Sequence, residues 1–122
     1  MTGDNNKITK LEDRKTVEIR PGLFKTNLSY NRELMMCRFL MKKGASIELH
    51  NHAAVQNGYI ISGKILFQVA GADMQVAGKG ELEAGAGYVW DSMEYHSFTA
   101  LEDSEFIECF TPTRPEYIVE AV

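Results

Sequence analysis

The sequence predicts an all-β fold, an antiparallel barrel or sandwich. Short apolar or alternating stretches follow one another closely along the chain, and glycine-rich turns separate them. Between residues 16 and 110, no stretch has the periodicity of an amphipathic helix. A chain of 122 residues corresponds to one domain and is long enough to bury a core without cross-links.

The first strands follow a polar N-terminal segment. Residues 16–20 alternate as a strand does, and Pro21–Gly22 is a turn signal before a second strand at 23–28. Residues 27–32 are rich in turn formers. Residues 33–41 are apolar at odd and even positions alike, which predicts a strand buried on both faces.

The later strands are short and closely spaced. A glycine turn at 62–64 and a hairpin turn at 71–73 separate them, and Gly78 and Gly80 are expected to flank another turn. The tail at 111–117 is predicted to be extended, because two prolines disfavour a helix. The remaining strands are expected at 65–70, 74–77, 81–83, 88–90, 95–100 and 105–110.

Domain limits and location follow from composition. Residues 1–15 are predicted to form a flexible N-terminal arm, with a short helix around 7–13, and residues 16–122 a single domain. The net charge of -4 argues against a nucleic-acid partner, which would need clustered Lys and Arg. No apolar run approaches the roughly 18 residues that span a membrane. The polar N-terminus does not resemble a secretory signal, so a cytoplasmic location is expected, with Cys37 and Cys109 as free thiols.

All three histidines belong to one candidate metal site. His50 and His52 are two residues apart, so their side chains point the same way from a strand, and two imidazoles on one face make half of a metal site. Gln56 opens the next strand and His96 comes later, after a turn. Solvated histidines near a turn are the alternative interpretation. A regular strand through His50 would also place Glu48 on the histidine face as a spare ligand, unless the strand bends there.

The spacing Gly44-x5-His50-x-His52-x3-Gln56-x6-Gly63 resembles the first motif of the cupin superfamily, with Gln56 where that motif normally has Glu. Gly85-x-Gly87 and His96 resemble the second motif, without its usual proline. The resemblance covers roughly residues 20–115. It implies a double-stranded β-helix, an antiparallel jelly-roll barrel. It also implies one divalent metal ion, Zn, Ni, Fe or Mn, held by His50, His52, Gln56 and His96.

The tail narrows the resemblance within the cupins. Gln56 together with Glu108-x-Phe110-x-Pro112-x-Arg114 is similar to the small single-domain cupins of the KdgF type. That family converts 4,5-unsaturated monouronates from pectin or alginate into linear keto sugars. The resemblance implies that Glu108, Phe110 and Arg114 line the pocket of a small anionic substrate. The family usually has Asp at the position of Glu108. Pairing into a homodimer, with the residues before Thr16 as the candidate contact, is a further expectation from the family.

A neutral ligand set makes the chemistry specific. Three imidazoles and an amide leave the charge of a divalent ion uncompensated, which favours an anionic, oxygen-bearing ligand. Arg114 could clamp a carboxylate, or be a surface cation. Glu108 could move a proton if its face of the strand is interior, or be solvated if it is exterior. Arg38, isolated among apolar residues, predicts an ion pair or a second clamp.

Two other function classes fit the same ligands. One is a cupin that binds or senses a sugar acid without turning it over, for which Glu108 would be dispensable. The other is an iron-dependent dioxygenase, because imidazole ligands suit several transition metals. The leading hypothesis is a metal-dependent isomerase or lyase-type step on an unsaturated uronate.

Overall fold

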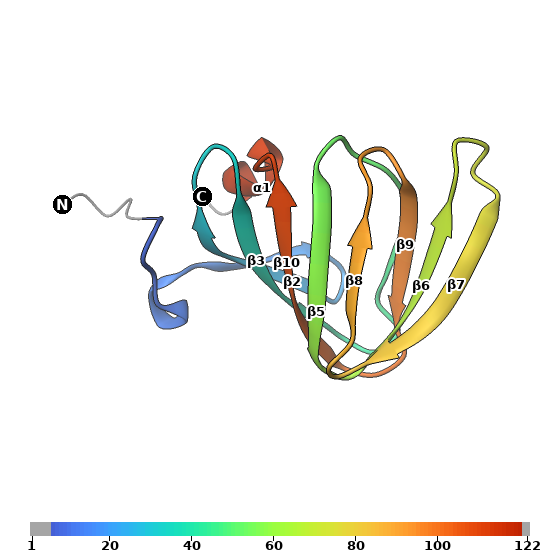
Figure 1. Ribbon diagram of the computed structural model, residues 1–122. Helices are drawn as coiled ribbons and strands as arrows, with labels where there is room; N and C mark the ends of the chain where they lie inside the picture. The colour runs from blue at the N-terminus through green and yellow to red at the C-terminus, as the bar shows by residue number, and fades with distance from the viewer. Residues whose placement is uncertain (1–5, 121–122) are drawn as a thin grey trace.

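The computed structural model describes residues 6–120 and contains two antiparallel sheets that face each other (Figure 1). The larger sheet has the strand order β1-β2-β3-β10-β5-β8, and the smaller one β4-β9-β6-β7. This confirms the predicted antiparallel barrel. The bounds of the strands are β1 Thr16–Arg20, β2 Leu23–Tyr30, β3 Met35–Met41, β4 Ser46–His50, β5 Val55–Ser62, β6 Lys64–Ala70, β7 Val76–Glu83, β8 Gly87–Trp90, β9 Tyr95–Ala100 and β10 Ser104–Thr111.

The chain crosses repeatedly between the two sheets. Strands β3, β5, β8 and β10 belong to the larger sheet, whereas β4, β6 and β9 belong to the smaller one. Antiparallel pairing then brings the end of one strand beside the start of another. His50 pairs with His96, Gln56 with Trp90, and Phe110 with Gln56. The ends of β4, β8 and β10 therefore meet the starts of β5 and β9 at one end of the barrel.

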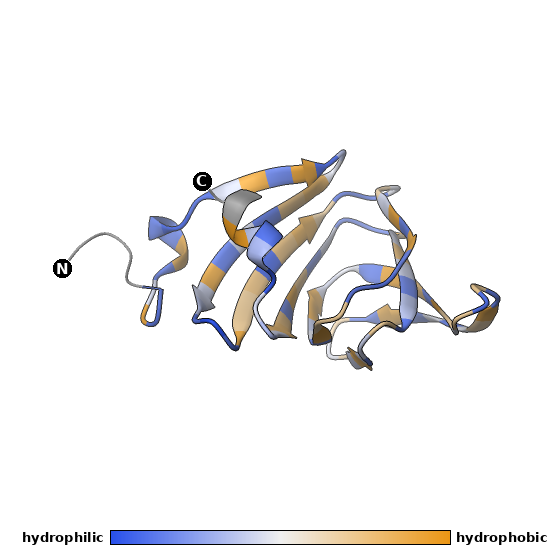
Figure 2. Cartoon of the chain, turned by 90° about the horizontal axis from the view of Figure 1, so that it is seen from above, coloured by the Kyte–Doolittle hydropathy of each residue, from blue (hydrophilic) through white to orange (hydrophobic). Residues whose placement is uncertain are grey.

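The core lies between the inner faces of the sheets. Apolar and polar residues alternate along most strands, which is visible from above in Figure 2. Burial alternates in the same way along β9 and β10. The buried apolar cluster draws on both sheets and comprises Leu23, Met35, Cys37, Phe39, Met41, Ile47, Ala54, Ile60, Ile65, Phe67, Phe98, Ala100, Phe106 and Phe110.

Strand β3 departs from the prediction that both of its faces are buried. Met35, Cys37 and Phe39 point into the core, but Met36 is exposed on the other face. Arg38 shares that outer face and pairs with Glu105 on β10, Nε to Oε2 at 2.5 Å. The apolar residues at both parities reflect an uncovered outer sheet surface, and the ion pair is the role that Arg38 takes.

Two predicted turns are strand instead. Residues 27–30 continue β2, with an irregularity opposite β3 between Asn27 and Ser29. Gly78 and Gly80 lie inside β7, where they pair with Val69 and Phe67 of β6. Turn-forming residues were overridden in both places because a neighbouring strand supplies hydrogen-bond partners along the whole segment.

The C-terminal tail is not wholly extended. Helix α1, Pro115–Glu120, begins within the segment predicted as extended. A proline is tolerated at the first position of a helix, because that residue's N–H would have no intrahelical partner in any case. Pro115 therefore starts the helix that it was expected to exclude.

The N-terminal segment lies along β2 from Asn6 onward. Tyr30 N donates to Asn6 O at 2.8 Å, and Thr9 Oγ1 donates to Leu28 O at 2.6 Å. The helix predicted around residues 7–13 is a single 3-10 turn, η1 Leu11–Asp13. Residues 1–5 of the predicted arm lie outside the described part. Across residues 6–120, no helix has both the length and the apolar character needed to cross a membrane.

Candidate metal centre

The three histidines converge at the end of the barrel where β4 stops and β9 starts. One nitrogen from each of His50, His52 and His96 lies within 4.8 Å of the other two. The ring centroids of His50 and His96 are 4.3 Å apart, and those of His52 and His96 are 5.0 Å apart. The fold therefore brings His50 and His52, which are neighbours in sequence, together with the distant His96, as the sequence predicts.

An irregularity in β4 explains how Ile47 and His50 can both point into the barrel. Ile47 pairs regularly with Phe98, and the register then shifts before His50 pairs with His96. Ile47 is buried in the core although a strict alternation would place it opposite to His50. Glu48 is exposed and does not join the histidine group, so the strand bends as one of the two sequence alternatives required.

Each imidazole is held by a hydrogen bond to a main-chain carbonyl two residues away. The Nδ1 atoms of His50, His52 and His96 donate to Glu48 O at 3.0 Å, Ala54 O at 2.8 Å and Glu94 O at 2.8 Å. A carbonyl oxygen only accepts, so the proton of each neutral ring resides on Nδ1. Each Nε2 then carries a free lone pair, and the Nε2 atoms of His52 and His96 are buried without a partner.

The electrostatics keep these rings neutral. Burial lowers the pKa of His96 to about 4, and it also lowers the pKa of His50 and of His52. The positive charge of Arg114 acts in the same direction on all three. Neutral imidazole is the form that binds a metal ion, so the rings are ready as ligands at neutral pH.

Gln56 completes the donor set and connects it to a buried carboxylate. Its Nε2 donates to Glu108 Oε2 at 3.0 Å, while its Oε1 is buried with no partner. Its side chain also acts on the pKa of His52, which places the two side by side. The amide oxygen is thus an unpaired acceptor next to the imidazole of His52.

Glu108 faces the interior of the barrel, which answers the question left open by the sequence. It is 2% exposed, and its Oε2 also accepts the hydroxyl of Tyr88 at 2.5 Å. Burial raises the pKa of Glu108 to about 7, although the bonds from Tyr88 and Gln56 and the charge of Arg114 lower it. Gly58 makes the contact possible, since a Cβ there would lie 2.2 Å from Tyr88 Cζ.

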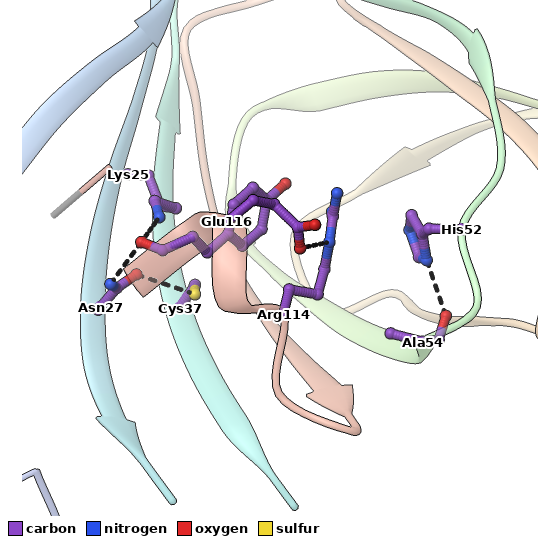
Figure 3. Close-up of polar contacts among 8 residues, drawn as sticks. Lys25, Asn27, Cys37, His52, Ala54, Arg114 and Glu116 are labelled. Carbon is purple, nitrogen blue, oxygen red and sulfur yellow. Dashed lines mark hydrogen bonds and ion pairs between the residues drawn. The ribbon is translucent and has the colours of Figure 1, made fainter. Parts of the chain in front are cut away.

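Phe110 and Arg114 lie beside the histidines at the end of β10. Phe110 is 1% exposed, with its ring centroid 6.1 Å from that of His52. Arg114 Cζ lies 5.4 Å from the Phe110 centroid, and Arg114 Nε bonds Glu116 Oε1 at 3.1 Å. Figure 3 shows Arg114 between Glu116 and His52. The guanidinium is partly buried rather than a fully exposed surface cation.

The donor set fits a divalent transition metal. Three buried or half-buried imidazoles with the proton on Nδ1, plus an amide oxygen without a partner, leave lone pairs that nothing in the described residues satisfies. Orphaned buried acceptors are costly unless a ligand uses them. The backbone carbonyls that orient the rings are the usual supporting partners of metal-bound histidine. His50, His52, His96 and Gln56 would hold the ion.

Sequence reasoning assigned no specific role to two aromatic residues of the site. Tyr88 bonds Glu108, and Trp90 stacks on His96 with centroids 5.9 Å apart at 17°. Both alternate with exposed Val89 on β8, so the pattern indicated a common inner face. The pairing of β8 with β5, which brings them to the site, is not readable from local sequence. Cys37 and Cys109 are free, as predicted.

The fold and the histidine group together define a cupin barrel with a candidate metal site. The sequence matches no family model and no curated protein, so the comparisons rest on structure. KdgF from Halomonas sp. superposes with a TM-score of 0.81 at 23% identity over 91% of this chain and 99% of that one. An RmlC-like cupin from Shewanella frigidimarina gives 0.80 at 24% identity over 90% and 94%.

A third neighbour is larger. Oxalate decarboxylase from Lactobacillus farciminis, as a formate complex, gives a TM-score of 0.74 at 21% identity over 96% of this chain and 37% of that one. The oxalate decarboxylase of Bacillus subtilis is described with Mn(II) centres. The chain therefore has the fold of a small cupin, and it resembles KdgF along nearly its whole length.

We predict that His50→Ala combined with His52→Ala abolishes binding of a divalent metal, because it removes two of the three converging nitrogens. Elemental analysis after dialysis against Zn²⁺, Ni²⁺, Fe²⁺ or Mn²⁺ measures it. Glu48→Gln is the matched control and should bind as the wild type does, since Glu48 lies outside the group. Full occupancy in the double variant would show that the ion binds elsewhere.

Glu108→Gln should change the pH dependence of the stability of the metal-free protein. The pKa of Glu108 is 4.5 in a model peptide and about 7 in the fold, so the folded state binds more protons between these values. Its contribution to the free energy of unfolding therefore falls as pH rises from about 4.5 to about 7. The stability of the variant relative to wild type should grow across this window and stay level above it.

Urea unfolding of the chelator-treated proteins at pH 4.5 and pH 8 measures this difference. Comparison at each pH cancels the opposite trend of the histidines, whose lowered pKa values make stability rise with pH. Glu81→Gln, at an exposed position on β7, is the control and should give a pH-independent difference. An equally pH-independent difference for Glu108→Gln would contradict the burial argument.

Proposed function

We propose that this protein is a metal-dependent cupin that acts on a small anionic sugar acid, opening the ring of 4,5-unsaturated monouronates. The observation that carries the proposal is that Gln56 links the histidine group to the buried carboxylate of Glu108. Gln56 has its unpaired oxygen beside the histidine group, next to His52, and donates its amide N–H to buried Glu108. One residue thus connects the metal centre to a carboxylate that can move a proton.

The charge of the site favours an anion. All the donors are neutral, and Arg114 lies next to them with its charge acting on the pKa of each histidine. An arginine fork matches a carboxylate with two parallel hydrogen bonds. A uronate carboxylate bound by Arg114 would therefore lie beside the histidine group.

Glu108 is suited to proton transfer. Burial holds its pKa near 7, between the usual values of a carboxylic acid and those of a strong base. Its Oε2 accepts from both Tyr88 and Gln56, which fixes the direction of the carboxyl group. Tyr88 itself has its pKa raised by burial and by Glu108, so it remains a hydrogen-bond donor.

The proposed reaction is an isomerisation with no net gain of atoms or electrons. The bond from the anomeric carbon to the ring oxygen breaks, the anomeric hydroxyl loses its proton to become an aldehyde, and the ring oxygen leaves on an enol. Protonation of the enol at carbon 4 gives the linear ketone. Glu108 would take the first proton and return one. A metal ion at His50, His52, His96 and Gln56 would supply Lewis-acid stabilisation of the developing oxygen charge.

The test follows loss of the cyclic form by NMR. Unsaturated monouronate is mixed with metal-loaded protein, and the rate is compared with the spontaneous reaction. We expect acceleration by the wild type, a loss of at least about 100-fold with Glu108→Gln, and a raised KM with Arg114→Ala, because general acid–base catalysis contributes about 10² or more. Glu81→Gln is the control and should retain the full rate.

Two outcomes would contradict the enzymatic proposal. Binding of the uronate without acceleration, unaffected by Glu108→Gln, would make the protein a binding or sensing cupin. Oxygen consumption that depends on Fe²⁺ would make it a dioxygenase.

We further propose that the protein is a cytoplasmic homodimer. Four large apolar side chains are exposed on the outer face of the six-stranded sheet, Met36, Tyr59, Ile61 and Val89. Val89 pairs with Asn57 on the neighbouring strand, two residues from Tyr59, and exposed apolar residues on one sheet face are typical of interfaces. Light scattering of the purified protein should give about twice the 13.7 kDa of one chain, and Tyr59→Asp should shift it towards the monomer. A wild-type mass of one chain at high protein concentration would contradict the proposal.

A further inference from the structure

The position of the Arg114 side chain is set by its neighbours in the C-terminal segment. Its Cζ lies 4.1 Å from the ring centroid of Tyr117 and 5.4 Å from that of Phe110. Its Nε bonds Glu116 Oε1 at 3.1 Å. A guanidinium on an aromatic face is attracted by the ring quadrupole and keeps its other N–H groups for a ligand. The guanidinium of Arg114 thus packs on the ring of Tyr117.

Two buried side chains of β2 hold Tyr117 in place by hydrogen bonds. Lys25 Nζ donates to Tyr117 O at 2.6 Å, and Asn27 Nδ2 donates to the same oxygen at 2.9 Å, as Figure 3 shows. This carbonyl belongs to α1, so the two donors attach the helix to β2 through one main-chain oxygen.

The two side chains that bond the Tyr117 carbonyl are polar and buried, which is unusual for a simple packing contact. Lys25 and Asn27 are 1% and 2% exposed, and burying a charged group is costly without close partners. Lys25 Nζ also lies 4.1 Å from the Tyr117 centroid, so it acts on the ring and on the carbonyl of the same residue. Cys37 Sγ donates to Asn27 Oδ1 at 3.4 Å, which fixes the orientation of the amide. An apolar pair would dock the helix, but it would not hold one carbonyl at one point.

We propose that Lys25, Asn27 and Tyr117 are positioning residues that aim the guanidinium of Arg114 at the anionic group of a ligand bound at the metal centre. This inference rests on the clamp role given to Arg114 in the proposed function. The chain of contacts runs from β2 through the Tyr117 carbonyl and ring to Arg114, which lies beside Phe110 and the histidines. These contacts therefore connect β2 to the charge selectivity of the site.

The experiment compares binding of an anion with binding of its neutral counterpart. Isothermal titration of metal-loaded protein with D-galacturonate and with its methyl ester gives the ratio of the two affinities. Tyr117→Leu removes the ring and should lower this ratio about fivefold to tenfold, while metal content stays at the wild-type level. Tyr117→Phe keeps the ring and the carbonyl, and should keep the ratio. Lys25→Met should lower the ratio in the same direction, with its fold checked by circular dichroism.

The outcomes separate this inference from the proposed function. If Arg114→Ala leaves the ratio unchanged, the clamp itself is wrong and both fall. If Arg114→Ala lowers the ratio but Tyr117→Leu does not, the clamp stands and the positioning inference is overturned. Equal weakening of both ligands by Tyr117→Leu would also overturn it, because a purely structural role moves both affinities together.

Discussion

The candidate site depends on three hydrogen bonds that are local in sequence. Each imidazole donates its Nδ1 proton to a main-chain carbonyl two residues away, so the backbone at three places sets the tautomer and the tilt of three rings. The barrel then only has to bring those places together. It does so by pairing β4 with β9 and by crossing from β4 to β5 at the same end. The three rings therefore already present one nitrogen each to a common region, within 4.8 Å of one another.

The buried carboxylate of Glu108 is linked to the histidine group through Gln56. Gln56 separates Glu108 from the imidazole of His52: its amide N–H donates to Glu108, and its oxygen has no partner on the other side. A glutamate at position 56 would have compensated the charge of an ion directly. With Gln56, the donor set stays neutral, and the buried carboxylate is that of Glu108, which accepts from both Gln56 and Tyr88. The cost of burying that carboxylate appears as its raised pKa, and the proposed proton transfer at neutral pH would make use of this shift.

The sequence predicted the barrel and the histidine group because both leave local signals. Glycine turns and alternating strands mark the fold, and His50 and His52 share a face by spacing alone. The two prolines of the tail predict an extended chain, but Pro115 occupies the first position of α1, where a helix tolerates proline. Tyr88 and Glu108 come together because β8 and β10 lie on either side of β5. The hydrogen bond from Asn27 to the Tyr117 carbonyl joins residues about ninety positions apart. Such pairings arise from topology, and the local pattern of a single sequence does not encode them.

The most direct test of the central claim is anomalous diffraction from crystals of the protein grown with a divalent transition metal such as Ni²⁺ or Zn²⁺. The account predicts one strong peak within about 2.0–2.2 Å of the Nε2 atoms of His50, His52 and His96, with the Gln56 oxygen facing it. A peak held through Nδ1 would contradict the account, because those atoms are committed to main-chain carbonyls. The absence of a peak between the three rings, or a peak at other residues, would contradict it as well.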